Sequence, residues 1–237
     1  MKAKTSLGDR MKVICFDLDD TLYKEIDYLK SAYKEIVLFA MSKVNSKKYS
    51  IELLYSEMLK TYLSGLNAFE FLNCKLNLNL PMVEYLNVYR NHKPHISLSK
   101  ETLDTLSFLQ NYKWEIGLIT DGRIVQQQNK IDALGLRRYV KKEDIIISEE
   151  FGYEKPSVEN YLYFEKSYPK ADIYIYVGDN LNKDFLTPNA LGWITICIKD
   201  NGLNIHKQNF HVPNKYLPHK IVSSISGITD ICNSLII

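Results

Sequence analysis

Short apolar runs rich in β-branched residues alternate with helical patterns along most of this chain. The runs occupy residues 12–16, 115–119, 144–147, 173–177 and 193–198. Nearly continuous apolar runs of this length are typical of strands that are buried on both faces. Because strands and helices alternate, we predict βαβ units. The expected fold class is α/β, with a doubly wound, Rossmann-like parallel sheet and helices on both of its faces.

The helical patterns have recognisable ends. Ser99 precedes leucines at a spacing of three and is the expected N-cap of one helix. Another helix is predicted from 124 to 134, because Gly135 is the residue type that commonly ends helices. The segment 219–235 is predicted as a last helix that packs its isoleucines inward.

Residues 24–96 interrupt the alternation of strands and helices. They contain three or four helical patterns and no convincing strand, with Asp27 and Ser50 as expected N-caps. The segment lies between the first and second predicted strands. We therefore interpret it as a helical domain that is inserted into an α/β core domain formed by residues 1–23 and 97–237.

Composition limits the function only weakly. The formal net charge is +2, and basic and acidic residues are interspersed, so nothing indicates a nucleic-acid partner. The N-terminus lacks the apolar stretch of a signal peptide, and no apolar run is long enough to span a bilayer. The four cysteines lack the paired spacing of a zinc site. We expect a cytoplasmic protein without membrane attachment, and we leave its oligomeric state open.

Polar residues cluster where four of the predicted strands end. In chain order they are Asp17-Leu18-Asp19-Asp20-Thr21, Thr120-Asp121-Gly122-Arg123, Gly152-Tyr153-Glu154-Lys155-Pro156, and Gly178-Asp179-Asn180 followed by Asp184. In open α/β sheets, ligands bind at the carboxyl ends of the strands. We therefore expect these four motifs to form one site.

The first motif places three carboxylates within four residues, which needs a reason because like charges repel. A carboxylate held in line with phosphorus can attack it, and Asp17, the first polar residue after its strand, is the expected nucleophile. A divalent cation would offset the repulsion between Asp17 and an anionic phosphate. Mg²⁺ prefers a few protein oxygens, which Asp17, the backbone carbonyl of Asp19 and Asp179 would supply.

Asp19 is expected to have a different role from Asp17. It can reach the leaving-group oxygen, donate a proton to it and later take one from water. This role needs a raised pKa, which crowding by other carboxylates can supply. An acidic run after a strand is also typical of a turn followed by a helix cap, and this alternative stays open for the first motif taken alone.

The other motifs supply groups that can bind a phosphoryl unit. Thr120 offers a hydroxyl with neighbouring backbone N–H groups, and Lys155 offers a point positive charge. Asp184 is expected to orient Lys155 or to reach the cation through water, with Asn180 as a competing candidate. Arg123 is either a clamp for an anionic part of the substrate or a salt-bridged residue at the start of the next helix.

Taken together, the four motifs resemble those of the haloacid dehalogenase (HAD) superfamily, over roughly residues 11–200. The similarity is to its phosphatase branch of subfamily I, which has a C1-type helical cap inserted after the first motif. The family motifs are Asp-x-Asp-x-Thr, a Ser or Thr, a Lys and an acidic pair. They are matched by Asp17, Asp19 and Thr21, by Thr120, by Lys155, and by Asp179 and Asp184.

The resemblance implies a Mg²⁺-dependent phosphatase that hydrolyses a small phosphorylated metabolite through an aspartyl-phosphate intermediate. The implied catalytic residues are Asp17, Asp19, Thr120 and Lys155. The implied metal residues are Asp17, Asp19, Asp179 and Asp184, and the implied substrate-binding residues are Thr120, Asp121, Gly122, Arg123 and Lys155. The Thr-Asp-Gly-Arg form of the second motif is similar to that of phosphatases acting on sugar phosphates or nonulosonate phosphates.

Three alternatives to a phosphatase stay open. A phosphomutase of the same superfamily shares all four motifs. A dehalogenase resembles the chain less, because those enzymes lack an acid at the position of Asp19. A non-catalytic binding module is disfavoured, because Asp17, Asp19, Lys155 and Asp179 are all present.

Overall fold

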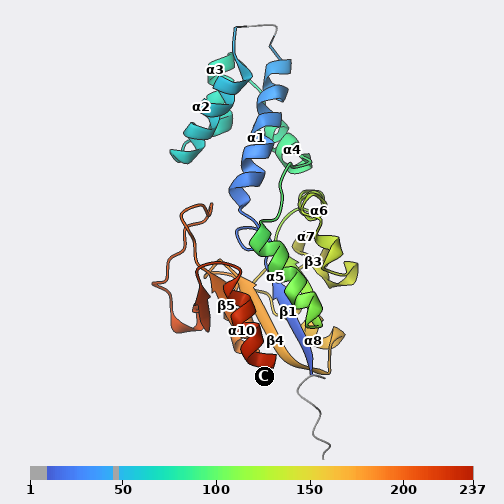
Figure 1. Cartoon of the computed structure of the whole chain (residues 1–237). Helices are drawn as coiled ribbons and strands as arrows, with labels where there is room; N and C mark the ends of the chain where they lie inside the picture. Colours follow the sequence, from blue (N-terminus) through green and yellow to red (C-terminus); the bar gives the residue numbers. More distant parts are fainter. Residues whose placement is uncertain (1–9, 45–47, 237) are drawn as a thin grey trace, which may run out of the picture.

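The computed structural model describes residues 10–44 and 48–236, and within them six parallel strands form one sheet in the order β3-β2-β1-β4-β5-β6 (Figure 1). The strands are β1 (Met11–Phe16), β2 (Trp114–Thr120), β3 (Ile145–Ile147), β4 (Ala171–Gly178), β5 (Ile194–Ile198) and β6 (Lys220–Val222). The first five correspond to the predicted runs, so the predicted parallel α/β sheet is confirmed.

The last strand was not expected from the sequence. β6 pairs with β5 in parallel, with Lys220 opposite Ile196, and it occupies the start of the segment predicted as a helix from 219 to 235. The helix α10 runs only over Gly227–Ile236, and Ile221 is 52% exposed rather than packed inward. A three-residue strand at the edge of a sheet forms through its backbone pairing, so its side chains carry no periodic signal.

Helices cover both faces of the sheet, as predicted. In the core domain they are α5 (Lys100–Asn111), α6 (Ile124–Ala133), α7 (Ser148–Phe151), α8 (Glu159–Ser167), α9 (Leu186–Ala190) and α10, with single turns η2 (Leu136–Arg138), η3 (Lys142–Asp144) and η4 (Asn214–Tyr216). On one face of β1, Ile14 packs in a cluster with Leu106 of α5 and Ile228 of α10. On the other face, Val13 packs in a cluster with Phe164 of α8. The alternation of side chains along β1 therefore serves both layers.

Two of the expected helix ends are confirmed. The Ser99 hydroxyl accepts a hydrogen bond from Thr102 N at 3.1 Å, at the start of α5. Gly135 follows Leu134, the C-cap of α6, and has φ of +65°, a conformation that glycine adopts without a steric penalty.

The segment between β1 and α5 forms four helices that lie beyond the carboxyl ends of the strands (Figure 1). They are α1 (Glu25–Ser42), α2 (Ile51–Leu63), α3 (Ala68–Leu76) and α4 (Met82–Asn91). They share a hydrophobic core that includes Ile36, Leu54, Met58, Leu72 and Tyr85. We call α1–α4 the helical insertion. Its expected extent of 24–96, and that of the core domain, stay predictions, and residues 1–9, 45–47 and 237 of these ranges lie outside the described residues.

Of the two N-caps expected in the helical insertion, one is confirmed and the other is wrong. The Ser50 side chain accepts a hydrogen bond from Leu53 N at 3.4 Å and so caps α2 as predicted. Asp27 lies within the first turn of α1 and is not its N-cap. The carboxylate of Asp20, from the loop after β1, instead accepts a hydrogen bond from Glu25 N at 3.0 Å. A side chain from the loop after β1 therefore binds the start of α1.

None of the helices formed by residues 10–44 and 48–236 combines the length and apolar character that crossing a bilayer requires.

Candidate active site

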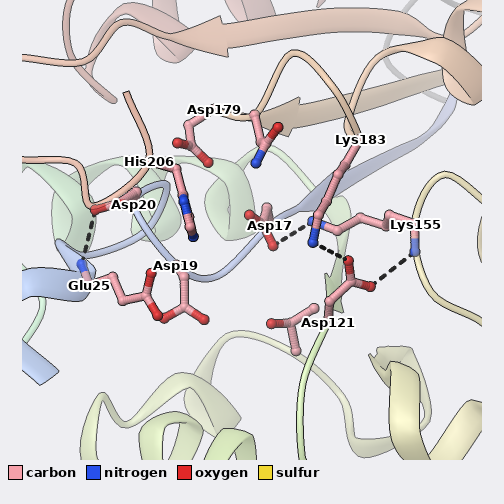
Figure 2. Close-up of a pocket in the computed structure, with 11 residues that line it drawn as sticks. Asp17, Asp19, Asp20, Glu25, Asp121, Lys155, Asp179, Lys183 and His206 are labelled. Atoms are coloured by element: carbon pink, nitrogen blue, oxygen red, sulfur yellow. Dashed lines mark hydrogen bonds and ion pairs between the residues drawn. The ribbon is translucent and has the colours of Figure 1, made fainter. Parts of the chain in front are cut away.

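The carboxyl ends of the strands surround a polar cavity of about 130 Å³ on the side of the helical insertion (Figure 2). Eight of the residues named in the four motifs line this cavity: Asp17, Asp19, Asp20, Thr120, Asp121, Lys155, Asp179 and Asn180. β1, β2 and β4 are neighbours in the sheet, so residues from three distant parts of the chain meet at one edge. The predicted convergence of the motifs is therefore present in the structure.

Asp17 and Lys155 form a buried ion pair at the base of the cavity. The Asp17 Oδ1 atom lies 2.7 Å from the Lys155 Nζ atom, and the two residues are 8% and 7% exposed. Burial raises the pKa of Asp17 to about 7, although Lys155 opposes this shift. Burial acts to lower the pKa of Lys155, but Asp17 and Asp184 more than offset it, so that pKa lies well above its ordinary value.

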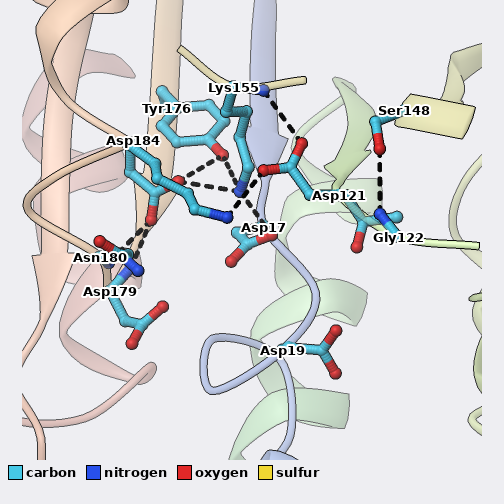
Figure 3. Close-up of polar contacts among 12 residues, drawn as sticks. Asp17, Asp19, Asp121, Gly122, Ser148, Lys155, Tyr176, Asp179, Asn180 and Asp184 are labelled. Carbon is cyan, nitrogen blue, oxygen red and sulfur yellow. Dashed lines mark hydrogen bonds and ion pairs between the residues drawn. The ribbon is translucent and has the colours of Figure 1, made fainter. Parts of the chain in front are cut away.

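Asp184 is fully buried and organises the surrounding groups (Figure 3). Its Oδ1 atom accepts hydrogen bonds from Lys155 Nζ at 2.9 Å and from the Tyr176 hydroxyl at 3.2 Å. Its Oδ2 atom accepts from the backbone N–H groups of Asp179 at 3.1 Å and Asn180 at 2.8 Å. Of the two roles predicted for Asp184, orienting Lys155 is the one that these contacts describe. Asn180 contributes to this arrangement through its backbone.

Three carboxylates offer a set of oxygens to a cation. One oxygen each of Asp17, Asp179 and Asp184 lies within 4.8 Å of the others. Burial, followed by the charges of Asp184 and Asp17, raises the pKa of Asp179 to about 9. Only the Lys155 ammonium is paired with any of these three carboxyl groups in the described residues, so their full ionisation in this buried place needs additional positive charge. A hard divalent cation such as Mg²⁺, which prefers carboxylate oxygens, fits this donor set.

Asp19 differs from its expected electrostatic state. Its two carboxylate oxygens accept hydrogen bonds from Lys130 Nζ at 2.7 and 2.8 Å, and Oδ2 also accepts one from Gln127 Nε2 at 3.1 Å. Burial acts to raise the pKa of Asp19, but Lys130, Tyr23 and Gln127 outweigh it and lower that pKa. The raised pKa predicted for Asp19 is therefore wrong for this arrangement, because a buried ammonium counters the crowding by carboxylates.

Residues of the second motif lie in a tightly bonded turn. Thr120 is 1% exposed, and its hydroxyl oxygen accepts a hydrogen bond from Gln127 Nε2 at 2.6 Å. Asp121 Oδ1 accepts a hydrogen bond from Lys155 N at 3.0 Å, which joins the second and third motifs. Gly122, with φ of +144°, donates its N–H to the Ser148 hydroxyl at 3.0 Å.

Arg123 lies outside the cavity. Its side chain is 57% exposed and forms an ion pair with Glu149, which also accepts a hydrogen bond from Ile124 N at the start of α6. Of the two alternatives for Arg123, the structure therefore shows the salt-bridged residue at the start of a helix.

The sequence of the chain is similar to those of known proteins. A sequence model of the family described as haloacid dehalogenase-like hydrolase matches residues 11–192. The chain belongs to this family. It is 30% identical to the glyceraldehyde 3-phosphate phosphatase of Methanocaldococcus jannaschii over 195 residues, which are 79% of this chain and 85% of that protein. The Methanopyrus kandleri protein of the same name is 27% identical over 198 residues, covering 80% of this chain and 84% of its own.

A partial match and the solved structures agree with the assignment to HAD-like hydrolases. A ribulose-1,5-bisphosphate 5-phosphatase of Halopiger xanaduensis is 34% identical over 102 residues, which is 43% of this chain and 42% of that protein. The magnesium-bound structure of the HAD-hydrolase YfnB from Bacillus subtilis aligns with a TM-score of 0.67 and 20% identity, covering 95% of this chain and all of that one. At this identity the structural likeness shows the fold alone. With its named relatives, the family match makes the chain a phosphoric monoester hydrolase, as predicted.

The structure of this HAD-like hydrolase also brings residues to the cavity that sequence reasoning missed. They are Lys183 after β4 and His206 from the loop after β5, which line the cavity, and Gln127 and Lys130 of α6, which bind Asp19. A signal for the last two existed, because polar residues three positions apart share a face of α6 with the buried Ile131. His206 lies in a segment without periodicity, so no sequence signal pointed to it.

Proposed function

We propose that the chain is a Mg²⁺-dependent phosphatase of a small sugar phosphate, and that it works through an aspartyl-phosphate on Asp17. The observation that carries this proposal is the position of Asp17. Its carboxylate lies 2.7 Å from the Lys155 ammonium and within 4.8 Å of an oxygen of Asp179. A nucleophile, a fixed positive charge and a cation ligand therefore share one small cavity.

The proposed reaction has two steps. A carboxylate oxygen of Asp17 attacks phosphorus, and the bond from phosphorus to the sugar oxygen breaks. Water then attacks the aspartyl-phosphate, which releases inorganic phosphate and regenerates Asp17. Lys155 and the Thr120 hydroxyl, which both line the cavity, stabilise the negative charge that builds on the phosphoryl oxygens.

We propose Asp19 as the group that donates a proton to the leaving oxygen and takes one from the attacking water. Asp19 lines the cavity, but both of its carboxylate oxygens are bound to Lys130. The role therefore requires the Asp19 side chain to leave Lys130 when substrate enters. Lys130 would then remain paired with Glu25, whose carboxylate lies 3.9 Å from it.

Mg²⁺ would be held by Asp17 and Asp179, because the oxygens of Asp184 already accept four hydrogen bonds. When bound, the cation offsets the repulsion between the Asp17 carboxylate and the phosphate. The role of Asp184 in this proposal is to hold Lys155 and the backbone of Asp179 in place.

The size and lining of the cavity support a short, polar substrate. Glu25, Lys183 and His206 also line the cavity and can hydrogen-bond hydroxyl or carbonyl groups of a sugar (Figure 2). Five relatives that match over at least 80% of their own length are named glyceraldehyde 3-phosphate phosphatases. A three-carbon sugar phosphate is therefore the first substrate to test. We further propose that the helical insertion acts as a cap that excludes water and selects the substrate.

A phosphate-release assay tests the proposal. Glyceraldehyde 3-phosphate, ribulose 1,5-bisphosphate, a nonulosonate phosphate and an aryl phosphate are each incubated with the protein and Mg²⁺. We expect release from at least one sugar phosphate, and loss of release in EDTA and in the D17N variant. Full activity of that variant would remove Asp17 as the nucleophile. An isomerised sugar phosphate without free phosphate would instead identify a phosphomutase.

A further inference from the structure

The loop between β5 and β6 lies against the candidate active site and against the start of the helical insertion (Figure 1). His206 from this loop lines the cavity, and Ile205 packs against the hydrophobic core of the helical insertion. The neighbouring Asn204 is only 8% exposed. A buried amide in an otherwise exposed loop has to find hydrogen-bond partners, and its partners reveal what the loop does.

Asn204 connects two charged groups from different parts of the fold. Its Nδ2 atom donates a hydrogen bond to Asp179 Oδ2 at 2.8 Å, and its Oδ1 atom accepts one from Lys24 Nζ at 2.6 Å. Only the amide NH₂ can donate to a carboxylate, and only the amide oxygen can accept from an ammonium. The two partners therefore fix the orientation of the amide between them.

Lys24 stands directly before α1, at the junction of the core domain and the helical insertion. A second bridge lies beside it. The Asp20 carboxylate accepts hydrogen bonds from Glu25 N and from Ile205 N, each at 3.0 Å. Two adjacent residues of the loop thus reach the junction, Asn204 directly at Lys24 and Ile205 by way of Asp20, which binds Glu25 N.

The loop is anchored on the side of β4 as well. Gln208 Nε2 donates hydrogen bonds to the backbone oxygens of Asp179 and Ile198, each at 2.8 Å. The end of β4, the loop and the first residues of the helical insertion are therefore one connected set of hydrogen bonds.

We propose that Asn204 is a positioning residue that orients the Asp179 carboxylate for a divalent cation and couples the cation site to the junction at Lys24. The inference rests on the proposed role of Asp179 as a cation ligand. Because Asn204 binds Oδ2, it restricts rotation of the carboxylate and leaves the other oxygen for the cation. If the junction and the cation site are coupled in this way, each affects the other. A substitution of Lys24 should therefore change the affinity for the cation, although Asp179 itself is unaltered.

The test is Mg²⁺ binding by isothermal titration calorimetry, without substrate. We expect Asn204→Leu, which keeps the branched shape of the side chain but removes both hydrogen bonds, to weaken Mg²⁺ binding by about tenfold or more, the usual effect of removing a group that orients a metal ligand. Lys24→Met should weaken it by a smaller factor, and in the double variant the two effects should not multiply, because they act through one chain of contacts. Asn201→Leu, a substitution of an exposed asparagine in the same loop, is the matched control.

Unchanged Mg²⁺ affinity in both Asn204→Leu and Lys24→Met would overturn the inference, as would independent effects in the double variant. If Asn204→Leu does not fold, Lys24→Met alone decides, since Lys24 does not contact Asp179. Phosphate release by the unaltered protein separates the two proposals. If the unaltered protein releases phosphate but its Mg²⁺ affinity is the same with and without Asn204, only the inference is refuted. If the unaltered protein releases no phosphate but its Mg²⁺ affinity depends on Asn204, only the proposed function is refuted.

Discussion

Replacing Lys130 by Met should destabilise the protein strongly, although Lys130 lies on a helix whose other side faces solvent. The Lys130 side chain is 2% exposed, and its ammonium lies 2.7 Å from the nearer oxygen of Asp19 and 3.9 Å from one of Glu25. It also lies 4.6 Å from the centre of the Tyr28 ring. Methionine fills a similar volume, so the substitution removes the charge while leaving little empty space.

The magnitude follows from the burial of Lys130 and the partial burial of Asp19, whose side chain is 19% exposed. Removing one partner of a buried ion pair leaves an uncompensated charge and costs about 3–5 kcal/mol. For a chain of this length each kcal/mol lowers the melting temperature by about 2–4 °C, so we expect a decrease of roughly 6–20 °C at pH 7. The assay is thermal unfolding followed by circular dichroism, in the presence of EDTA so that metal binding does not contribute.

Two further variants make this prediction refutable. Lys30→Met removes an exposed ammonium that lies 3.7 Å from Asp27, and an exposed pair contributes at most about 1 kcal/mol. Asp19→Asn in the Lys130→Met background removes the stranded carboxylate and should recover part of the lost stability. A decrease for Lys130→Met no larger than that for Lys30→Met, or no recovery in the double variant, would refute the reasoning.

Three other predictions concern the cavity. Gly178→Ala would place a Cβ atom 2.4 Å from Asp184 Oδ2, so the carboxylate has to move. We expect kcat for phosphate release to fall about a hundredfold, as it does when catalytic groups are misplaced. An unchanged kcat would contradict the role given to Asp184. His206→Ala should raise KM for a sugar phosphate several-fold with little change in kcat, whereas His211→Ala, an exposed control, should change neither. Arg123→Ala should leave KM within about twofold, because a surface ion pair holds this side chain away from the cavity; a large rise in KM would restore its role as a clamp.

Much of the core domain could be predicted from the sequence, because its information is local. Five strands were recognisable from short apolar runs, and parallel strands bring their carboxyl ends to one edge. It followed that Asp17, Thr120, Lys155 and Asp179 would lie together, and in the structure they line one cavity. Neither the order of the strands nor any side-chain distance was needed for that expectation.

The electrostatic state of each acid depended on partners far away in the chain. Asp19 and Lys130 are separated by more than a hundred residues, and no local pattern pairs them. For the same reason crowding by nearby carboxylates predicted the wrong direction for the pKa of Asp19. A pKa depends on every charge within a few ångströms, whatever its position in the sequence.

Which chemical groups stand at the ends of the strands can be inferred from the amino-acid sequence, since strand periodicity and motif order are properties of neighbouring residues. Which of those groups are paired, which loop lies against them and how the helical insertion is bonded to the loop beside the site depend on the folded packing, as Asn204 between Asp179 and Lys24 illustrates. Those contacts form through packing of segments that are distant along the chain, and hydrogen bonds and ion pairs depend on distances that packing alone sets.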